Sequence, residues 1–143
     1  MKYSFHYLLM AEHSTLQKEL LSRLRGTGLT IGQPKVLDYL QDHDGASQKD
    51  IAAGCHIEAG TLTSLLNRME ESGLVERRIL NGNRRSYHIF MTEKGKQLLN
   101  IVTETFKGLE EEAFLGIPVE DRIKFMDLFF QIYENMRNCR ITD

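Results

Sequence analysis

Four arginines lie close together in an otherwise mildly acidic chain. Arg77, Arg78, Arg84 and Arg85 flank the turn sequence Asn-Gly-Asn, with no acidic residue between the first and the last of them, although the 143-residue chain has a formal net charge of −2. Arginine stays protonated in proteins, and its planar guanidinium can donate two parallel hydrogen bonds to a phosphate or to guanine. Because local charge decides whether a surface attracts phosphates, the cluster indicates a surface that binds nucleic acid.

The turn between these arginines predicts a β-hairpin. The segments before and after it alternate in polarity and contain β-branched and aromatic side chains, and an Asn-Gly pair between such segments is a strong hairpin signal. Arg84 and Arg85 are then expected at the tip, where arginine gains from the negative potential of a DNA minor groove. Because Arg77 and Arg78 alternate across the first strand, at most one of them should face DNA. We expect the other to pair with Glu76 or a neighbouring acid.

Two short helices precede the hairpin and must position a second polar set beside it. Residues 47–55 begin with Ser47 as N-cap and should stop at Gly54, and residues 58–73 form the next helix, which Gly73 ends. In this second helix the apolar residues recur at i, i+3, i+4 and i+7 and predict a buried stripe of Leu62, Leu65, Leu66 and Met69. Helix, turn, helix and hairpin in this order predict a winged helix-turn-helix, whose second helix enters a major groove.

The opposite face of that second helix carries short polar side chains, which would allow close approach to bases and phosphates. The predicted DNA contacts from both helices and the hairpin are Ser47, Gln48, Gly60, Thr61, Thr63, Ser64, Asn67, Arg68, Asn83, Arg84 and Arg85. Asn67 could pair with adenine, and Arg68 with guanine or a phosphate. Helix-turn-helix shapes also occur in proteins that bind no DNA, so a winged-helix module that binds another protein is the alternative interpretation.

Further helices complete a mostly helical fold with one small β-hairpin. One helix is predicted over residues 3–25, and a second begins at Thr30, as the N-cap of a capping box with Gln33. Thr92 should cap a long helix after the hairpin. The last helix, residues 121–138, has an apolar face too wide for one contact stripe and needs a second surface to bury it. At this length, a single domain is expected.

Three stretches of the sequence carry a resemblance to a known family: "LTIGQPKVL", "SQKDIAAGCHIEAGTLTSLLNRMEESGLVERR" and "NGNRRSYHIFMTEKG". They resemble the MarR-type regulators, and the resemblance covers essentially the whole length of the chain. Its most specific part is the wing, where the family has Asp-x-Arg, a strand and then Leu-Thr-x-x-Gly. The matching residues here are Asn83, Arg85, Met91, Thr92 and Gly95. Asn83 thus replaces an acid that would support Arg85, and Glu58 stands where the family often has a Ser cap. An acid favours a helix N-terminus but repels a nearby phosphate.

The resemblance implies a fold, an assembly and a function. It implies one MarR-like domain over residues 1–143, with a winged helix-turn-helix lobe at 30–92 and dimerisation helices at 1–25 and 96–143. A homodimer would bind a pseudo-palindromic operator in double-stranded DNA, with half-sites roughly 34–36 Å apart. The regulator would be a repressor released by a small aromatic or amphipathic effector bound between the dimerisation helices and the lobe. Candidate lining residues are His6, Met10, His13 and Tyr39.

Other functions find less support in the sequence. GxSxG, GxxxxGK[ST] and HExxH motifs are absent, so we expect no enzyme and no catalytic residues. The five histidines lack the spacing of a metal site, and no metal or cofactor is expected. Two distant cysteines, no signal peptide and no long apolar run favour a reduced, cytoplasmic protein without a membrane span. Cys55 lies in the helix-turn-helix turn and leaves open the alternative of a redox-sensing regulator, in which peroxide would weaken DNA binding.

Overall fold

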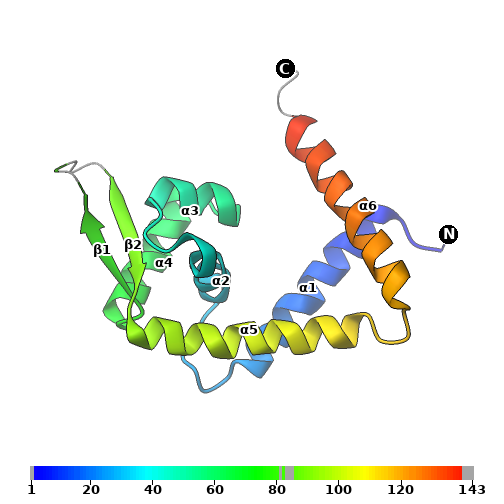
Figure 1. The fold of residues 1–143 in the computed structure, drawn as a ribbon, viewed down its shortest axis with the longest axis horizontal. Helices are drawn as coiled ribbons and strands as arrows, with labels where there is room; N and C mark the ends of the chain where they lie inside the picture. Colours follow the sequence, from blue (N-terminus) through cyan, green and yellow to red (C-terminus); the bar gives the residue numbers. More distant parts are fainter. Residues whose placement is uncertain (1, 81, 83–85, 140–143) are drawn as a thin grey trace. The chain divides into compact units, whose positions relative to one another are not determined.

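The helices and the hairpin follow the expected order along the chain. The computed structural model describes residues 2–80, 82 and 86–139, which fall into two compact units, Met1–Leu109 and Glu110–Asp143. The elements are α1 (Phe5–Arg23), α2 (Gln33–His43), α3 (Gln48–Cys55), α4 (Ala59–Glu71), β1 (Val75–Ile79), β2 (Tyr87–Met91), α5 (Glu93–Ala113) and α6 (Val119–Asn138). The predicted fold class, mostly helical with a small hairpin, is confirmed (Figure 1).

The N-terminus of α2 differs from the predicted one. The helix begins at Gln33, and its N-cap is Gly32 at φ 89°, so the expectation of Thr30 as N-cap was wrong. Part of the capping box still forms, because the side-chain oxygen of Gln33 accepts the Thr30 N–H at 3.1 Å. The left-handed conformation suits glycine, and a Cβ at Gly32 would lie 2.8 Å from Cδ1 of Leu65 on α4. This close approach to α4 has no signature in the local sequence.

The start of α3 is confirmed, whereas its expected end is not. The Ser47 hydroxyl accepts the N–H of Asp50 at 3.1 Å, as an N-cap does. The helix continues through Gly54 and ends at Cys55, with His56 in a left-handed conformation at φ 54°. Gly54 therefore allows α3 to pack closely against Tyr39 on α2, because a Cβ at this position would collide with the tyrosine ring.

One apolar core fixes α4 against the other helices of the first unit. All four residues of the predicted stripe are buried: Leu62, Leu65, Leu66 and Met69. Burying each such side chain stabilises the fold by roughly 1.5–3 kcal/mol. At the other end of the unit, Leu20 and Leu24 of the α1 region join this core, while Leu9 of α1 is 42% exposed. The described protomer thus buries apolar side chains of α1 only toward the C-terminal end of the helix.

The two-stranded hairpin is also hydrogen-bonded to a segment outside it. Strands β1 and β2 pair antiparallel, with Val75 opposite Met91 and Ile79 opposite Tyr87. The segment between α2 and α3 adds to β2, because Gly45 donates to the Ile89 carbonyl at 2.7 Å and Ile89 donates to the Ala46 carbonyl at 3.0 Å. Figure 1 shows the hairpin, called the wing below, beside α3 and α4. The wing is therefore hydrogen-bonded to the segment that leads into α3.

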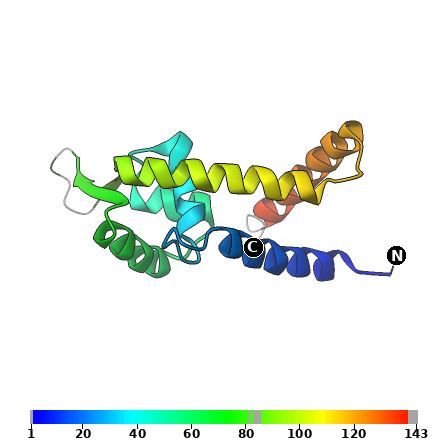
Figure 2. The same ribbon diagram turned by 90° about the horizontal axis from the view of Figure 1, so that it is seen from below.

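The long helix α5 begins directly after the wing and runs without a break (Figure 2). The predicted cap is confirmed: the Thr92 hydroxyl oxygen accepts the Gly95 N–H at 3.1 Å and donates to the Gly73 carbonyl at 2.6 Å. Thr92 thereby also joins the start of α5 to the end of α4. A Cβ on Gly95 would collide with the carbonyl oxygen of Leu74, so only glycine fits there.

In the second unit, α6 carries a broad apolar surface. None of its residues is buried in the described protomer, and Phe130 is 61% exposed. Phe125 packs edge-on against Phe114 at 5.9 Å and stacks on Phe129 at 5.5 Å. Among the described helices, none is both long and apolar enough to cross a membrane.

Candidate nucleic-acid interface

The outer face of α4 consists of short or flexible polar residues. Six of the predicted contacts lie on this helix, and all six are exposed: Gly60, Thr61, Thr63, Ser64, Asn67 and Arg68. The buried Leu62, Leu65, Leu66 and Met69 anchor the opposite face. A helix held in this way can enter a major groove without exposing apolar surface.

Arg77 on β1 is bound to α4 rather than free for phosphate. Its Nη1 donates to Asn67 Oδ1 at 2.6 Å, and its Nη2 donates to the Thr63 carbonyl at 3.2 Å. Its backbone N–H donates to Glu70 Oε2 at 3.2 Å, and Nη1 lies 3.9 Å from Glu70 Oε1. The side chain is only 15% exposed. Arg77 therefore joins the wing to the outer face of α4.

The other strand arginine is also engaged. Arg78 Nη2 lies 3.0 Å from Glu76 Oε2, which is the pairing expected from the sequence, and its guanidinium stacks over Phe90 at 4.3 Å. Neither strand arginine therefore stands as an unpaired cation. The three predicted contacts at the wing tip, Asn83, Arg84 and Arg85, lie outside the described residues, and their roles stay predictions.

The two predicted contacts at the start of α3 also have intramolecular partners. The Ser47 hydroxyl caps α3, and Ser47 lies opposite His88 of β2. Gln48 Nε2 donates to Thr63 Oγ1 at 2.7 Å, and the Thr63 hydroxyl donates to the Ala59 carbonyl at 3.0 Å. Gln48 thus joins α3 to α4. The Gln48–Thr63 bond joins two helices across 15 positions, and Ser47 meets His88 from a more distant segment, so no periodic pattern predicts either contact.

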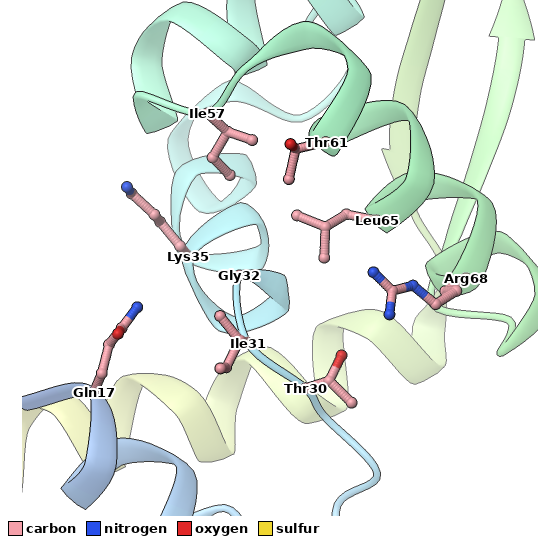
Figure 3. A pocket seen from close by; sticks show the side chains of 9 residues that line it. All are labelled: Gln17, Thr30, Ile31, Gly32, Lys35, Ile57, Thr61, Leu65 and Arg68. Atoms are coloured by element: carbon pink, nitrogen blue, oxygen red, sulfur yellow. The ribbon is translucent and has the colours of Figure 1, made fainter. Parts of the chain in front are cut away.

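A cavity of about 520 Å³ lies beside the inner edge of α4. Figure 3 shows Arg68, Leu65 and Thr61 of α4 on one side of it and Ile31 on the other, with Lys35 of α2 at its rim and the lysine side chain directed away from Arg68. The remaining lining residues are Gln17, Thr30, Gly32 and Ile57. Lys35 and Arg68 make this cavity basic. Lys35 is exposed, as a lysine on an amphipathic helix normally is, so the sequence gives no sign that it borders a cavity.

The four residues predicted to line an effector pocket do not line this cavity. His6, Met10 and His13 are exposed on α1. Tyr39 packs against Gly54 and stacks on His43 with ring centroids 4.2 Å apart. The structure therefore gives these four residues other surroundings, and a pocket formed by them stays a prediction.

Cys55 has the surroundings of a packing residue. It is 2% exposed, and its Sγ lies 3.8 Å from the Lys35 carbonyl oxygen. Burial raises the pKa of the thiol, with Lys35 lowering it and Asp38 raising it further. Because the thiolate is the reactive form, this site does not favour the redox-sensing alternative. Among the described residues, no group of three or more His, Cys, Asp or Glu could hold a metal ion.

Comparisons with known proteins agree on one family. A sequence model of the MarR family matches residues 29–87. The organic hydroperoxide resistance transcriptional regulator of Bacillus subtilis is 32% identical over 110 residues, which are 75% of each chain. The regulator TtmR of Methylorubrum extorquens is 33% identical over 102 residues, 69% of this chain and half of its own length. The fold of the MepR–DNA complex from S. aureus matches with a TM-score of 0.85 at 22% identity, over 94% of this chain and 99% of that one.

Proposed function

Because this chain belongs to the MarR family of transcriptional regulators, we propose that it binds double-stranded DNA as a homodimer and represses transcription from a pseudo-palindromic operator. The observation that carries the proposal is the outer face of α4, which is polar and exposed while its inner face is fully packed. The named relatives are regulators and not enzymes.

The proposed contacts divide between α4 and the wing. Gly60, Thr61 and Ser64 lie near the start of α4, where small side chains and free backbone N–H groups favour approach to phosphates and base edges. Arg68 is the exposed cation of α4 and would contact guanine or a phosphate. Arg84 and Arg85 would contact the minor groove from the wing tip. A relative of the same fold, MepR, has been solved as a DNA complex.

The homodimer is supported by the surface that the protomer leaves exposed. The exposed apolar residues of α6 include Ile123, Phe130 and Met136, at 58%, 61% and 65% exposure. Contiguous apolar surface of this kind marks an interaction site in soluble proteins. A twofold partner would bury it and would place two α4 helices roughly 34–36 Å apart, one turn of DNA.

The basic cavity supports release by a small ligand. An anionic aromatic or amphipathic effector would pair with Lys35 and Arg68 and fill the apolar space beside Ile31 and Leu65. Arg68 belongs to α4, so a ligand that recruits it withdraws a cation from the proposed DNA contact. Such a ligand binds the DNA-free state better, and it therefore lowers operator affinity. The regulator would act in the cytoplasm.

The test is binding of the purified full chain to its own upstream DNA, titrated against salt, with an unrelated duplex of equal length as control. We expect selective binding, and the logarithm of the binding constant should fall steeply with the logarithm of the salt concentration. Arg68→Ala should weaken binding and reduce that slope by about one if Arg68 contacts a phosphate. Lys107→Ala removes the same charge from an exposed position on α5 and should change little. Weak binding that is equal on both duplexes would overturn the proposal.

A further inference from the structure

The side-chain amide of Asn67 is held in one orientation. Its Oδ1 lies 2.6 Å from Nη1 of Arg77. A guanidinium has only donors, so the amide must turn its oxygen toward Arg77 and its NH₂ group away. Among the described residues, Nδ2 of Asn67 has no hydrogen-bond partner. The exposed end of this side chain therefore offers donors.

Arg77 is itself fixed and can hold that orientation. Its Nη2 donates to the Thr63 carbonyl at 3.2 Å, and its backbone N–H is bound by Glu70 at 3.2 Å. Thr63, Asn67 and Glu70 follow one another at helical spacing, so a single edge of α4 faces β1. With 15% of its side chain exposed, Arg77 forms charge-assisted bonds that are only partly screened by water. Rotation of the Asn67 amide would place two donors against each other and lose the short bond.

This arrangement changes what Asn67 can recognise. The usual adenine contact of asparagine is bidentate, in which Oδ1 accepts from the adenine N6 amino group while Nδ2 donates to N7. In this protein Oδ1 is already bound by Arg77. The free NH₂ group needs acceptors, and guanine presents two of them, N7 and O6, while thymine presents O4. Adenine also presents N7, but its neighbouring N6 amino group is a donor that would be left facing an amide whose oxygen is already bound by Arg77.

We propose that Arg77 is a specificity-determining residue that never touches DNA: it fixes Asn67 as a donor, so that Asn67 selects guanine or thymine rather than adenine. The inference rests on the proposed DNA-binding function and adds to it the base preference of one helix position. It replaces the adenine contact that residue type alone suggests. Arg77 acts here as a positioning residue for Asn67.

The test is selection of bound sequences from a randomised duplex library, followed by affinity measurements on single-base variants. The full-length proteins compared are wild type, Asn67→Ala, Asn67→Asp and Arg77→Met. Arg78→Met is the matched control, because Arg78 pairs with Glu76 and stacks on Phe90 without touching Asn67. Melting curves of every variant report whether it folds.

We expect wild type to prefer guanine or thymine at one position of each half-site by about tenfold, and Asn67→Ala to lose that preference. Asn67→Asp presents only acceptors, so the preference should move to cytosine or adenine, whose amino groups donate. Arg77→Met frees the amide and should make adenine acceptable there, while Arg78→Met should not. Should Arg77→Met fail to fold, Arg77→Lys keeps a donor for Oδ1 and should retain the wild-type preference.

Two outcomes would overturn the inference while leaving DNA binding intact. One is a preference for adenine that is lost in Asn67→Ala, together with weaker binding when that adenine is replaced by purine, which lacks the N6 amino group. The other is an equal loss of affinity on every sequence in Asn67→Ala. If wild type selects no sequence at all, the proposed function itself fails, and the inference fails with it.

Discussion

Replacement of Gly54 by alanine should destabilise this protein, although the same change stabilises most helices. Gly54 lies inside α3, where the helix propensity of alanine would contribute about 1 kcal/mol. Its Cβ, however, would lie 2.8 Å from Cζ and 3.0 Å from Cδ2 of Tyr39, and closer still to Cε2. The ring cannot withdraw freely, since it stacks on His43 at 4.2 Å. Overpacking of this kind costs about 1–3 kcal/mol, so we expect a net loss of about 1 kcal/mol.

Urea unfolding measures this effect, with every variant at one protein concentration, because the proposed dimerisation would couple stability to concentration. Gly60→Ala is the matched control, since no atom lies within 4 Å of its ideal Cβ, and it should stabilise by about 0.5 kcal/mol. In a Tyr39→Ala background the collision disappears, and Gly54→Ala should then stabilise by about 1 kcal/mol. A Gly54→Ala protein more stable than wild type with Tyr39 present would refute the steric reasoning.

Three further predictions concern capping, pH and assembly. Ser47→Ala removes the hydroxyl that caps α3 and should cost about 1 kcal/mol in urea unfolding, whereas Ser64→Ala on the exposed face of α4 should cost little. Burial and then the neighbouring Asp42 raise the pKa of Asp38, so its ionised form opposes folding. Asp38→Asn should therefore raise the melting temperature slightly at pH 7. The gain should vanish as the pH falls below about 3.9, where the carboxyl is protonated in both the folded and the unfolded protein. A gain in melting temperature that persists in acid would contradict this prediction. Phe130→Asp places a charge on the apolar face of α6 and should weaken the proposed dimer at least about tenfold, as measured by sedimentation. An unchanged dissociation constant would exclude that face from the interface.

Local chemistry is enough to predict most of the elements. Ser47 and Thr92 cap α3 and α5 as expected, because an N-cap depends on residues within three positions of it. The stripe of α4 is buried as its 3.6-residue period indicates. The hairpin follows from alternation and an Asn-Gly turn. Where local reasoning failed, at Thr30 and Gly54, a contact with a distant residue decided the outcome: Leu65 lies against Gly32, and Tyr39 lies against Gly54.

The candidate site divides in the same way. The sequence by itself determined that a polar helix face and an arginine-rich wing lie next to each other, because periodicity and turn chemistry are properties of neighbouring residues. Only the tertiary structure decided which of those groups remain available. Arg77 binds Asn67 from ten positions away, and Lys35 shares a cavity with Arg68. Hydrogen bonds between elements depend on how the core orients those elements, and the core that orients α4 against β1 is assembled from residues throughout the first unit.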